Sequence, residues 1–445
     1  MKAIHMFAVL ALATLLSLPA LARDWYVSAA GTGDGLTAGS PTQDLAAVLN
    51  SAVADDALYL NGGDGFGYAP NLLTVAVRLS LQSYGAGQAI ISNTSVAGSQ
   101  LLNITAGGSG STLNNIQFLF NDMNGYPDPY RTIYLDNNAN NVTIKHCGFR
   151  HADAPGGAYE NNSFIEFNAA SAHANVVIAN NVFSDLRYEN GFKYRHYIIV
   201  ASGANDMIVA NNIVSNYEGF IRFYWDSARV KVLSNKLYRC YGSLNWSSIS
   251  AETAGGLMKV GWGGLSAGDS EFGWNIIFNG FPDMTNDSQY AAFLLDYPCN
   301  DLKVHNNTFY GLGAACLINH GGWVQNMDWY NNILIVCNPA NATFGFYSGV
   351  ADGIWSGTVY SNIWDPFQTF NSPYFSGDNV HLADNPQLDP LFASLDPGSS
   401  AFLRPTNTVA AYGLGSYIGA VNPVPEPVFF GCALAIAALT LARKR

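Results

Sequence analysis

Hydrophobic and polar residues follow a repeated pattern from about residue 114 to residue 364. Each repeat has an apolar run of period two, a pair that usually contains Asn, and a second apolar run. The second residues of these pairs are separated by 31, 35, 31, 23, 40, 32, 25 and 30 positions. They are Asn115, His146, Asn181, Asn212, Asn235, Asn275, Asn307, Asn332 and Asn362. A short motif at a loosely constant period predicts a solenoid with loops of variable length.

Period two is the spacing of a β-strand, because alternate side chains face opposite sides. The pair marks a bend, since Asn tolerates left-handed conformations and its amide can bond to an Asn in the next coil, about 4.8 Å away. β-Branched residues and Gly dominate and no long segment of period 3.6 occurs, so helical or leucine-rich repeats fit poorly. The repeats instead resemble the right-handed parallel β-helix, over roughly residues 25–365.

That resemblance implies an all-β fold: a single-stranded, right-handed parallel β-helix solenoid of about a dozen coils. Residues 24–28 and 45–53 are similar to the strand and short amphipathic helix that open secreted β-helix carbohydrate-active proteins and cap their first coil. A cap is needed because an open coil exposes a strand edge and an apolar core. We expect a signal peptide at 1–22, the cap and first coils at 23–110, the repeats at 111–365, an irregular tail at 366–420 and a sorting signal at 421–445.

The N-terminus has the composition of a secretory signal peptide. Lys2 precedes an apolar stretch that reaches Leu18, and residues 20–22 supply the small side chains of a cleavage site. We therefore expect export through the secretion machinery, with Arg23 as the first residue of the mature protein.

The C-terminus has three parts in order: a Pro-rich motif, an apolar stretch at 428–442 and a basic cluster at 443–445. Fifteen apolar residues are short for a stable span, and the basic cluster would stay on the cytoplasmic side. These parts resemble the PEP-CTERM sorting signal of bacterial exosortase substrates, with Pro425, Glu426 and Pro427 as the motif. The resemblance implies transient membrane insertion of a C-terminal hydrophobic helix and cleavage near the motif by an exosortase-type sorting protease. The protein would then stay in the cell envelope, at the outer surface or in the extracellular matrix.

A GPI signal and a plain membrane anchor are the alternatives for this tail. A GPI signal normally lacks the terminal basic residues and needs small residues at its cleavage site. The rest of the composition suits a secreted all-β protein, with 44 Gly, 13% aromatic and 12% charged residues. Five cysteines remain without the tail, and buried free thiols or one disulfide, such as Cys299 to Cys316, both fit. No spacing indicates a metal site.

Charge is the best indication of function. The formal net charge of −12 argues against nucleic acid as a partner. Yet eleven of the sixteen Lys and Arg residues outside the two terminal segments fall between Lys145 and Lys259, mixed with Tyr and Trp. Guanidinium groups beside aromatic faces suit a carbohydrate groove, above all one for uronates or sulfated sugars. The candidate polysaccharide-binding residues are Arg150, Arg187, Lys193, Arg195, Arg239 and Trp225.

The same residues have a structural interpretation. Four residues lie four positions after the second residue of their pair and are expected to stack in one row: Arg150, Asp185, Asn216 and Arg239. Such a row can be a polar ladder that only satisfies a turn, with acids such as Glu166 and Glu189 neutralising it. Both interpretations stay open.

If the groove is catalytic, β-elimination from a uronate needs a cation for the carboxylate, a base for the C5 proton and an acid for the leaving oxygen. Arg222 is the candidate cation, and Tyr188, Tyr194 and His196 are the candidate proton carriers. A hydrolase needs two or three carboxylates on one face instead, for which only Asp283, Asp287, Asp296 and Asp301 are close in sequence.

Residues 194–226 resemble the family of alginate lyases and chondroitinase B when they are aligned on Asn205 and the Asn pair at 211–212. The resemblance places Arg222 on the family's Arg. It places Ala201 where the base Lys stands, and Tyr194 and His196 where carboxylates help to bind calcium. It therefore assigns a role to Arg222 alone and leaves a need for calcium open.

Two function classes remain. In the first, the protein is an exported, exosortase-sorted surface or matrix protein whose central coils bind or degrade polysaccharide. If it is an enzyme, we expect a lyase rather than a glycoside hydrolase. The alternative is a non-catalytic structural or adhesin-like surface protein, because parallel β-helices serve both purposes.

Overall fold

The computed structural model describes residues 21–403, with gaps. The gaps are residues 70, 95–99, 121–130, 152–161, 170, 186–195, 218, 225–226, 241–255, 261–269, 279–290, 296–298, 313–316, 320–323, 337–345, 349–354, 361, 365–379, 382–391, 393, 395, 397–398 and 400. Residues 1–20 and 404–445 lie outside the described part. The predicted signal peptide therefore lies almost entirely outside it, and the predicted sorting motif at Pro425, Glu426 and Pro427 lies wholly outside it. Among the described residues, no helix has the length and apolar character to cross a membrane.

Three parallel sheets, named A, B and C, make up the structure. Sheet A contains β1 (Asp24–Val27), β2 (Asp56–Asn61), β5 (Leu79–Tyr84), β8 (Thr112–Asn114), β11 (Thr143–Lys145), β15 (Val177–Ala179), β19 (Ile208–Ala210), β22 (Lys231–Leu233), β25 (Ser270–Gly273), β28 (Cys299–Asn300), β29 (Leu302–His305), β32 (Val324–Tyr330) and β35 (Trp355–Tyr360). Sheet B contains β3 (Gly65–Tyr68), β6 (Ala89–Asn93), β9 (Ile116–Phe120), β12 (Gly148–His151), β16 (Val182–Asp185), β20 (Ile213–Tyr217), β23 (Lys236–Cys240), β26 (Ile276–Phe278), β30 (Thr308–Leu312), β33 (Ile333–Val336), β36 (Ile363–Trp364) and β37 (Val380–His381). Sheet C contains β4 (Leu73–Val75), β7 (Gln100–Ile104), β10 (Arg131–Leu135), β13 (Asn162–Phe167), β17 (His196–Ser202), β21 (Gly219–Tyr224), β24 (Gly256–Val260), β27 (Ala291–Leu295), β31 (Leu317–Asn319) and β34 (Phe346–Ser348).

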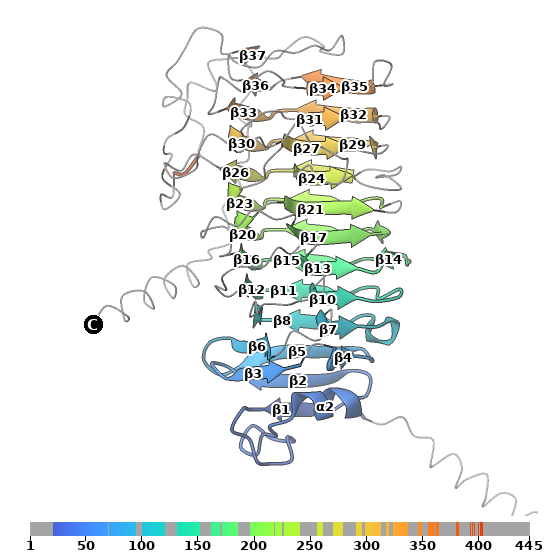
Figure 1. Ribbon diagram of the computed structural model, residues 1–445, viewed down its shortest axis with the longest axis vertical. Helices are drawn as coiled ribbons and strands as arrows, with labels where there is room; N and C mark the ends of the chain where they lie inside the picture. The colour runs from blue at the N-terminus through green and yellow to red at the C-terminus, as the bar shows by residue number, and fades with distance from the viewer. Residues whose placement is uncertain are drawn as a thin grey trace, which may run out of the picture.

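Each coil visits sheet A, then sheet B, then sheet C, so that strands far apart in sequence lie side by side (Figure 1). A short pair, β14 (His173–Ala174) with β18 (Ala204–Asn205), and one 3-10 turn, η1 (Ala106–Gly108), lie between sheets C and A in the chain. The predicted all-β parallel β-helix is confirmed.

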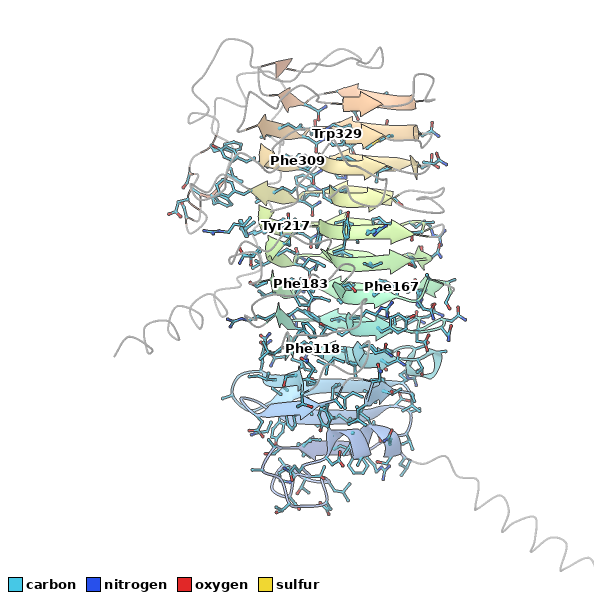
Figure 2. All side chains as sticks on the ribbon, viewed as in Figure 1. Phe118, Phe167, Phe183, Tyr217, Phe309 and Trp329 are labelled. Atoms are coloured by element: carbon cyan, nitrogen blue, oxygen red, sulfur yellow. The ribbon has the colours of Figure 1, made fainter. Side chains whose placement is uncertain are left out.

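The interior of the column is filled mainly by alternate side chains of the strands, and in sheet C two consecutive residues are buried, as at Phe220 and Ile221. In sheet A, for example, Leu113, Ile144 and Ile178 lie in register and are fully buried. In sheet B, the rings of Phe118, Phe149 and Phe183 form a stack with centroids 5.2 and 4.7 Å apart. Figure 2 labels the large buried aromatic side chains along the column. Such stacking of like residues is what a solenoid of equal coils requires.

An asparagine ladder holds the bend between sheets A and B. It consists of Asn181, Asn212, Asn235, Asn275, Asn307, Asn332 and Asn362, which are all buried. From Asn212 onward each Oδ1 accepts two hydrogen bonds from the preceding coil, as when Asn212 accepts from the backbone N (2.9 Å) and Nδ2 (3.0 Å) of Asn181. Each Nδ2 also donates to a backbone oxygen of an earlier coil, as Asn212 does to Ile178 at 2.9 Å. The predicted hydrogen bonds between stacked Asn amides are confirmed.

The asparagine ladder begins two coils later than the sequence pattern suggests, at Asn181. Asn115 and His146 take the first, left-handed position of the bend, with φ of 57° and 54°, as Asn180 does in the next coil. The ladder position of the second of these coils is Cys147, whose backbone N donates to Asn181 Oδ1 at 2.9 Å. The predicted second-position role of Asn115 and His146 is therefore wrong by one residue. Burial raises the pKa of the Cys147 thiol to about 12, so it stays a neutral core group.

The N-terminal end of the column is covered by β1 and by α2 (Leu45–Ser51) (Figure 1). Asp44 caps the helix by accepting from the backbone N of Ala47 at 3.0 Å. Leu45, Val48 and Leu49 are buried, so the helix presents an apolar face to the first coil. The domain boundaries themselves stay predictions.

A described segment after the last coils packs on the outer face of sheet B. Phe402 contacts the rings of Tyr238 and Phe278, with centroids 6.1 and 4.9 Å away. Phe392 contacts Tyr310 at 6.2 Å. Three outward aromatic rings of sheet B are thus covered by the protein's own chain.

Candidate functional site

A row of side chains runs across consecutive strands on the outer face of sheet C. The register of β10, β13, β17 and β21 places Tyr134, Glu166, Val200 and Arg222 beside one another. In each strand the preceding residue points into the core, and these fully buried residues are Ile133, Ile165, Ile199 and Ile221. Because side chains alternate between the two faces of a strand, the row faces outward. In Figure 1 these four strands lie one above another.

An ion pair joins the first two strands of this face. Arg131 Nη2 lies 2.7 Å from Glu166 Oε1, and the two side chains are 17% and 15% exposed. The Ser163 hydroxyl donates to the other Glu166 oxygen at 3.1 Å. A pair this far removed from water is held more tightly than a surface pair, since either charge alone would be poorly solvated. Arg131 and Glu166 therefore form a fixed and electrically balanced part of the face.

Tyr134 lies beside this pair. The Arg131 guanidinium carbon is 4.8 Å from the centroid of the Tyr134 ring, a cation–π distance. Burial is the main cause that raises the pKa of the Tyr134 phenol; the Arg131 charge lowers this pKa, whereas the Glu166 charge raises it. A tyrosine whose pKa lies above its ordinary value near 10 keeps its proton at neutral pH and can donate a hydrogen bond.

Arg222 and Tyr197 form the other half of the face. The Arg222 guanidinium carbon lies 5.7 Å from the Tyr197 ring centroid. The Tyr197 ring covers Gly219, its register partner in β21, so closely that a Cβ there would overlap the ring carbons. Gly219 therefore lets the ring lie flat against the sheet, where it supports Arg222.

We expect Gly219→Ala to lower the free energy of unfolding by about 1–3 kcal/mol, because the new methyl group must displace the Tyr197 ring. Thermal unfolding followed by circular dichroism measures the change. Gly65→Ala is the matched control, since nothing lies within 4 Å of a Cβ at that strand position. Equal effects of the two substitutions would contradict the close fit of the ring on Gly219.

The residues predicted from sequence are distributed over different parts of the molecule. Arg222 lies in the outward row of sheet C. His196 is a strand residue of β17 and pairs with Asn162, but its side chain is not among those described. Six further candidates lie outside the described residues: Tyr188, Tyr194, Arg187, Lys193, Arg195 and Trp225.

Arg150 and Arg239 lie on sheet B, not with Arg222 on sheet C. The predicted common row is also wrong for one member. Arg150 pairs with Ser184, whereas Asp185 pairs with His151. Asn216 and Arg239 follow the paired Ser215 and Tyr238, and both adopt left-handed conformations, with φ of 55° and 53°. The prediction placed the bend of this coil one residue too early, at His146, and therefore assigned Arg150 to the row that His151 occupies. A shift of one position moves a side chain to the other face of the strand.

The alignment with alginate lyases does not give an outward residue at the base position. Ala201 and Ser202 are buried, and the residue of β17 in the outward row is Val200. An aliphatic side chain therefore stands between Glu166 and Arg222. It offers no group that moves a proton.

Carboxylates do not gather in the described part of the chain. No three His, Cys, Asp or Glu side chains there lie close enough to hold a metal ion. Of the four acids considered for hydrolysis, Asp301 is described; it has a left-handed φ of 55° and accepts from Asn326 Nδ2 at 3.0 Å. Asp301 is thus a turn residue, while Asp283, Asp287 and Asp296 lie outside the described residues.

Sequence reasoning missed Arg131 and Tyr134. It included Tyr197 only among the aromatic residues mixed with the basic cluster, and Glu166 only as a neutralising acid. Arg131 precedes the basic cluster, so charge clustering could not find it. For Tyr134, which lies between the buried Ile133 and Leu135, the available signal was position in the strand, because a polar residue between two buried aliphatic residues faces outward.

No family model matches the chain, and no curated protein sequence does. Among solved structures, a rhamnogalacturonan lyase matches with a TM-score of 0.56 and 13% identity over 89% of this chain and 99% of its own. A pectate lyase matches with a TM-score of 0.48 and 12% identity over 87% of this chain and 90% of its own. A lacto-N-biosidase from Eubacterium ramulus matches with a TM-score of 0.49 and 12% identity over 81% and 67% of the two chains. At 13% identity, the match to the rhamnogalacturonan lyase shows a shared fold.

Proposed function

We propose that this protein is an exported parallel β-helix protein that binds polysaccharide along the outer face of sheet C. The observation that supports it is the strip of polar and aromatic side chains on four consecutive strands. Its members are Arg131, Tyr134, Glu166, Tyr197 and Arg222. Such a strip offers hydrogen bonds and guanidinium–aromatic surfaces coil after coil, which suits a chain-like ligand.

The charge of the strip favours an acidic polysaccharide. Arg131 and Glu166 form an ion pair at 2.7 Å, and Arg222 adds a second guanidinium to the strip. A guanidinium can bind a carboxylate or a sulfate through two parallel hydrogen bonds. Uronate and sulfated polysaccharides are therefore the ligand classes that we propose.

Whether the protein also cleaves its ligand depends on proton carriers beside Arg222. Val200 and Ala201 supply none, which favours a non-catalytic surface protein as the second candidate function. A lyase would draw its base and acid from Tyr188, Tyr194 and His196, and a hydrolase from carboxylates elsewhere. The lyase that shares the fold supports a polysaccharide ligand more than it supports a reaction, because β-helices host many activities.

The composition of the two chain ends supports a proposal for the place of action. We propose that the signal peptide directs export and that the tail, with Pro425, Glu426 and Pro427, is processed by an exosortase-type protease. The protein then remains in the cell envelope, at the outer surface or in the matrix, where polysaccharide is abundant.

Binding of the purified protein to alginate, polygalacturonate, a sulfated galactan and neutral glucans tests the proposal. We expect the acidic chains to bind best and Arg222→Ala to weaken that binding about tenfold, the loss of one charged contact. Arg78→Ala is the matched control, because it removes an equal charge from an exposed pair with Asp55 near β5. Equal losses in both variants, or no binding of any acidic chain, would contradict a site on sheet C.

The same mixtures, with and without calcium, decide the reaction. New ultraviolet absorbance from unsaturated sugar ends that Arg222→Ala abolishes identifies a lyase. New reducing ends alone identify a hydrolase. Binding without either product identifies the non-catalytic alternative.

A further inference from the structure

A second outward surface lies on sheet A in the last described coils. The register of β25, β29, β32 and β35 aligns two parallel rows. One row holds Gly273, His305, Tyr330 and Tyr360. The other holds Glu271, Lys303, Asp328 and Thr358. We call these eight residues the sheet A patch; it belongs to a different sheet from the site described above.

Three rings of the patch form a regular stack. His305 and Tyr330 have centroids 5.0 Å apart with planes 10° from parallel, and Tyr330 and Tyr360 are 5.2 Å apart at 8°. The rings therefore recur at the spacing of the coils. Within the described residues no strand pairs with β35 beyond Tyr360, and this tyrosine is 37% exposed. The stack ends in an accessible aromatic ring.

Carboxylates lie beside the rings. Glu271 Oε1 lies 2.8 Å from His305 Nε2, and Asp328 Oδ1 accepts from the Thr358 hydroxyl at 2.6 Å. Burial is the main cause that raises the pKa of the Tyr330 phenol; the neighbouring Tyr360, Glu271 and Asp328 raise this pKa further, whereas the Lys303 charge lowers it. Lys303 lies in register between Glu271 and Asp328, and two carboxylates against one ammonium leave this row with a formal negative charge, which disfavours an acidic ligand.

A similar aromatic row on sheet B has a different environment. Its rings, Tyr238, Phe278 and Tyr310, lie under Phe392 and Phe402 of the C-terminal segment. The sheet B row also contains no carboxylate, whereas the sheet A row has two beside it. The covered row is apolar packing. The sheet A patch combines aromatic rings with hydrogen-bond acceptors and keeps Tyr360 exposed.

We propose that the sheet A patch is a second polysaccharide-binding site, specific for neutral sugar chains. A chain parallel to the long axis meets a ring and a polar group at each of the three coils that carry His305, Tyr330 and Tyr360. Carboxylates accept hydrogen bonds from pairs of sugar hydroxyls, and tyrosine rings supply apolar contact together with a hydroxyl. The repulsion that Glu271 and Asp328 exert on uronates sets this site apart from the sheet C site.

Affinity electrophoresis of the purified protein in gels that contain a neutral glucan, a xylan or a galactan tests this site. We expect at least one of these polymers to retard the protein, and Tyr360→Ala and Asp328→Asn each to weaken that retention about tenfold. Asp328→Asn keeps an oxygen for the Thr358 hydroxyl, so it tests the charge without removing that hydrogen bond. Thermal unfolding of each variant verifies that it is folded.

Tyr59→Ala is the matched control. Tyr59 belongs to the same sheet at its opposite end and stacks on Tyr26, with centroids 5.1 Å apart and planes 17° from parallel. The adjacent row holds Asp24, Ala57 and Ser80 in register, so it has one carboxylate, at the outermost strand, where the sheet A patch has two. Retention on neutral polymers should persist in Tyr59→Ala and in Arg222→Ala.

Three results would overturn the second site. The first is no retention by any neutral polymer, the second is equal loss in Tyr59→Ala, and the third is loss in Arg222→Ala with retention kept in Tyr360→Ala. The third result would place neutral binding on sheet C, and a loss of acidic binding alone would concern the sheet C proposal only.

Discussion

Replacing Asn212 by alanine will lower the free energy of unfolding by about 3–5 kcal/mol, because several buried groups lose their partners at once. Asn212 Oδ1 accepts from both nitrogens of Asn181, at 2.9 and 3.0 Å. Its Nδ2 donates to the backbone oxygen of Ile178 and to Asn235 Oδ1, both at 2.9 Å. Alanine restores none of these bonds, and the site is too deeply buried for bulk water to replace them. Equilibrium unfolding in guanidinium chloride measures the loss.

The neighbouring residue provides the control. Asn211 is exposed and adopts a left-handed φ of 55°, a conformation that glycine tolerates without strain. Asn211→Gly should therefore change stability by well under 1 kcal/mol, roughly the range of such exchanges. If the two substitutions cost the same, the ladder hydrogen bonds would contribute nothing beyond the turn itself.

The second large effect is expected at Glu166. Glu166→Gln removes the charge that balances Arg131 and should lower the free energy of unfolding by about 2–4 kcal/mol, because the guanidinium stays where water reaches it poorly. The same change makes the sheet C face more positive. Binding of an acidic polysaccharide should therefore become tighter while stability falls, and titration calorimetry together with guanidinium unfolding measures both.

Asp206→Asn is the control for this ion pair. Asp206 binds Arg229 at 2.6 Å with nearly the same contact, but the two side chains are 42% and 50% exposed. Water solvates both charges after the substitution, so stability should change little. A smaller loss for Glu166→Gln than for Asp206→Asn would show that burial does not strengthen the Arg131 pair.

The fold could be predicted because one short motif carries it. An Asn at the bend has few substitutes, since its amide must donate and accept in the same plane while the residue before it takes a positive φ. The first coils could not be placed in register by the same rule. Ile116 and Cys147 hold the ladder position in these coils. The correct register there follows only from Leu113 and Ile144, which lie in register and point into the core.

The candidate site was less accessible to prediction. A cluster of charges along the sequence does not define a face, because each coil sends its residues to three sheets. Arg150 and Arg239 lie on sheet B, whereas Arg222 lies on sheet C. Arg131 and Glu166, which are 35 positions apart, meet only because the loops between their strands close one full coil. Loop lengths vary, so no fixed sequence spacing announces such a pair.

The asparagine ladder also gives the column a direction of growth. Every Oδ1 accepts from the coil before it, so the backbone N of each ladder residue stays unsatisfied until the following coil arrives. A chain that emerges N-terminus first, with its first end already closed by α2, can add coils one at a time, and each arrival completes the hydrogen bonds of its predecessor. Assembly that starts at the opposite end would leave each new coil facing an open, uncapped edge.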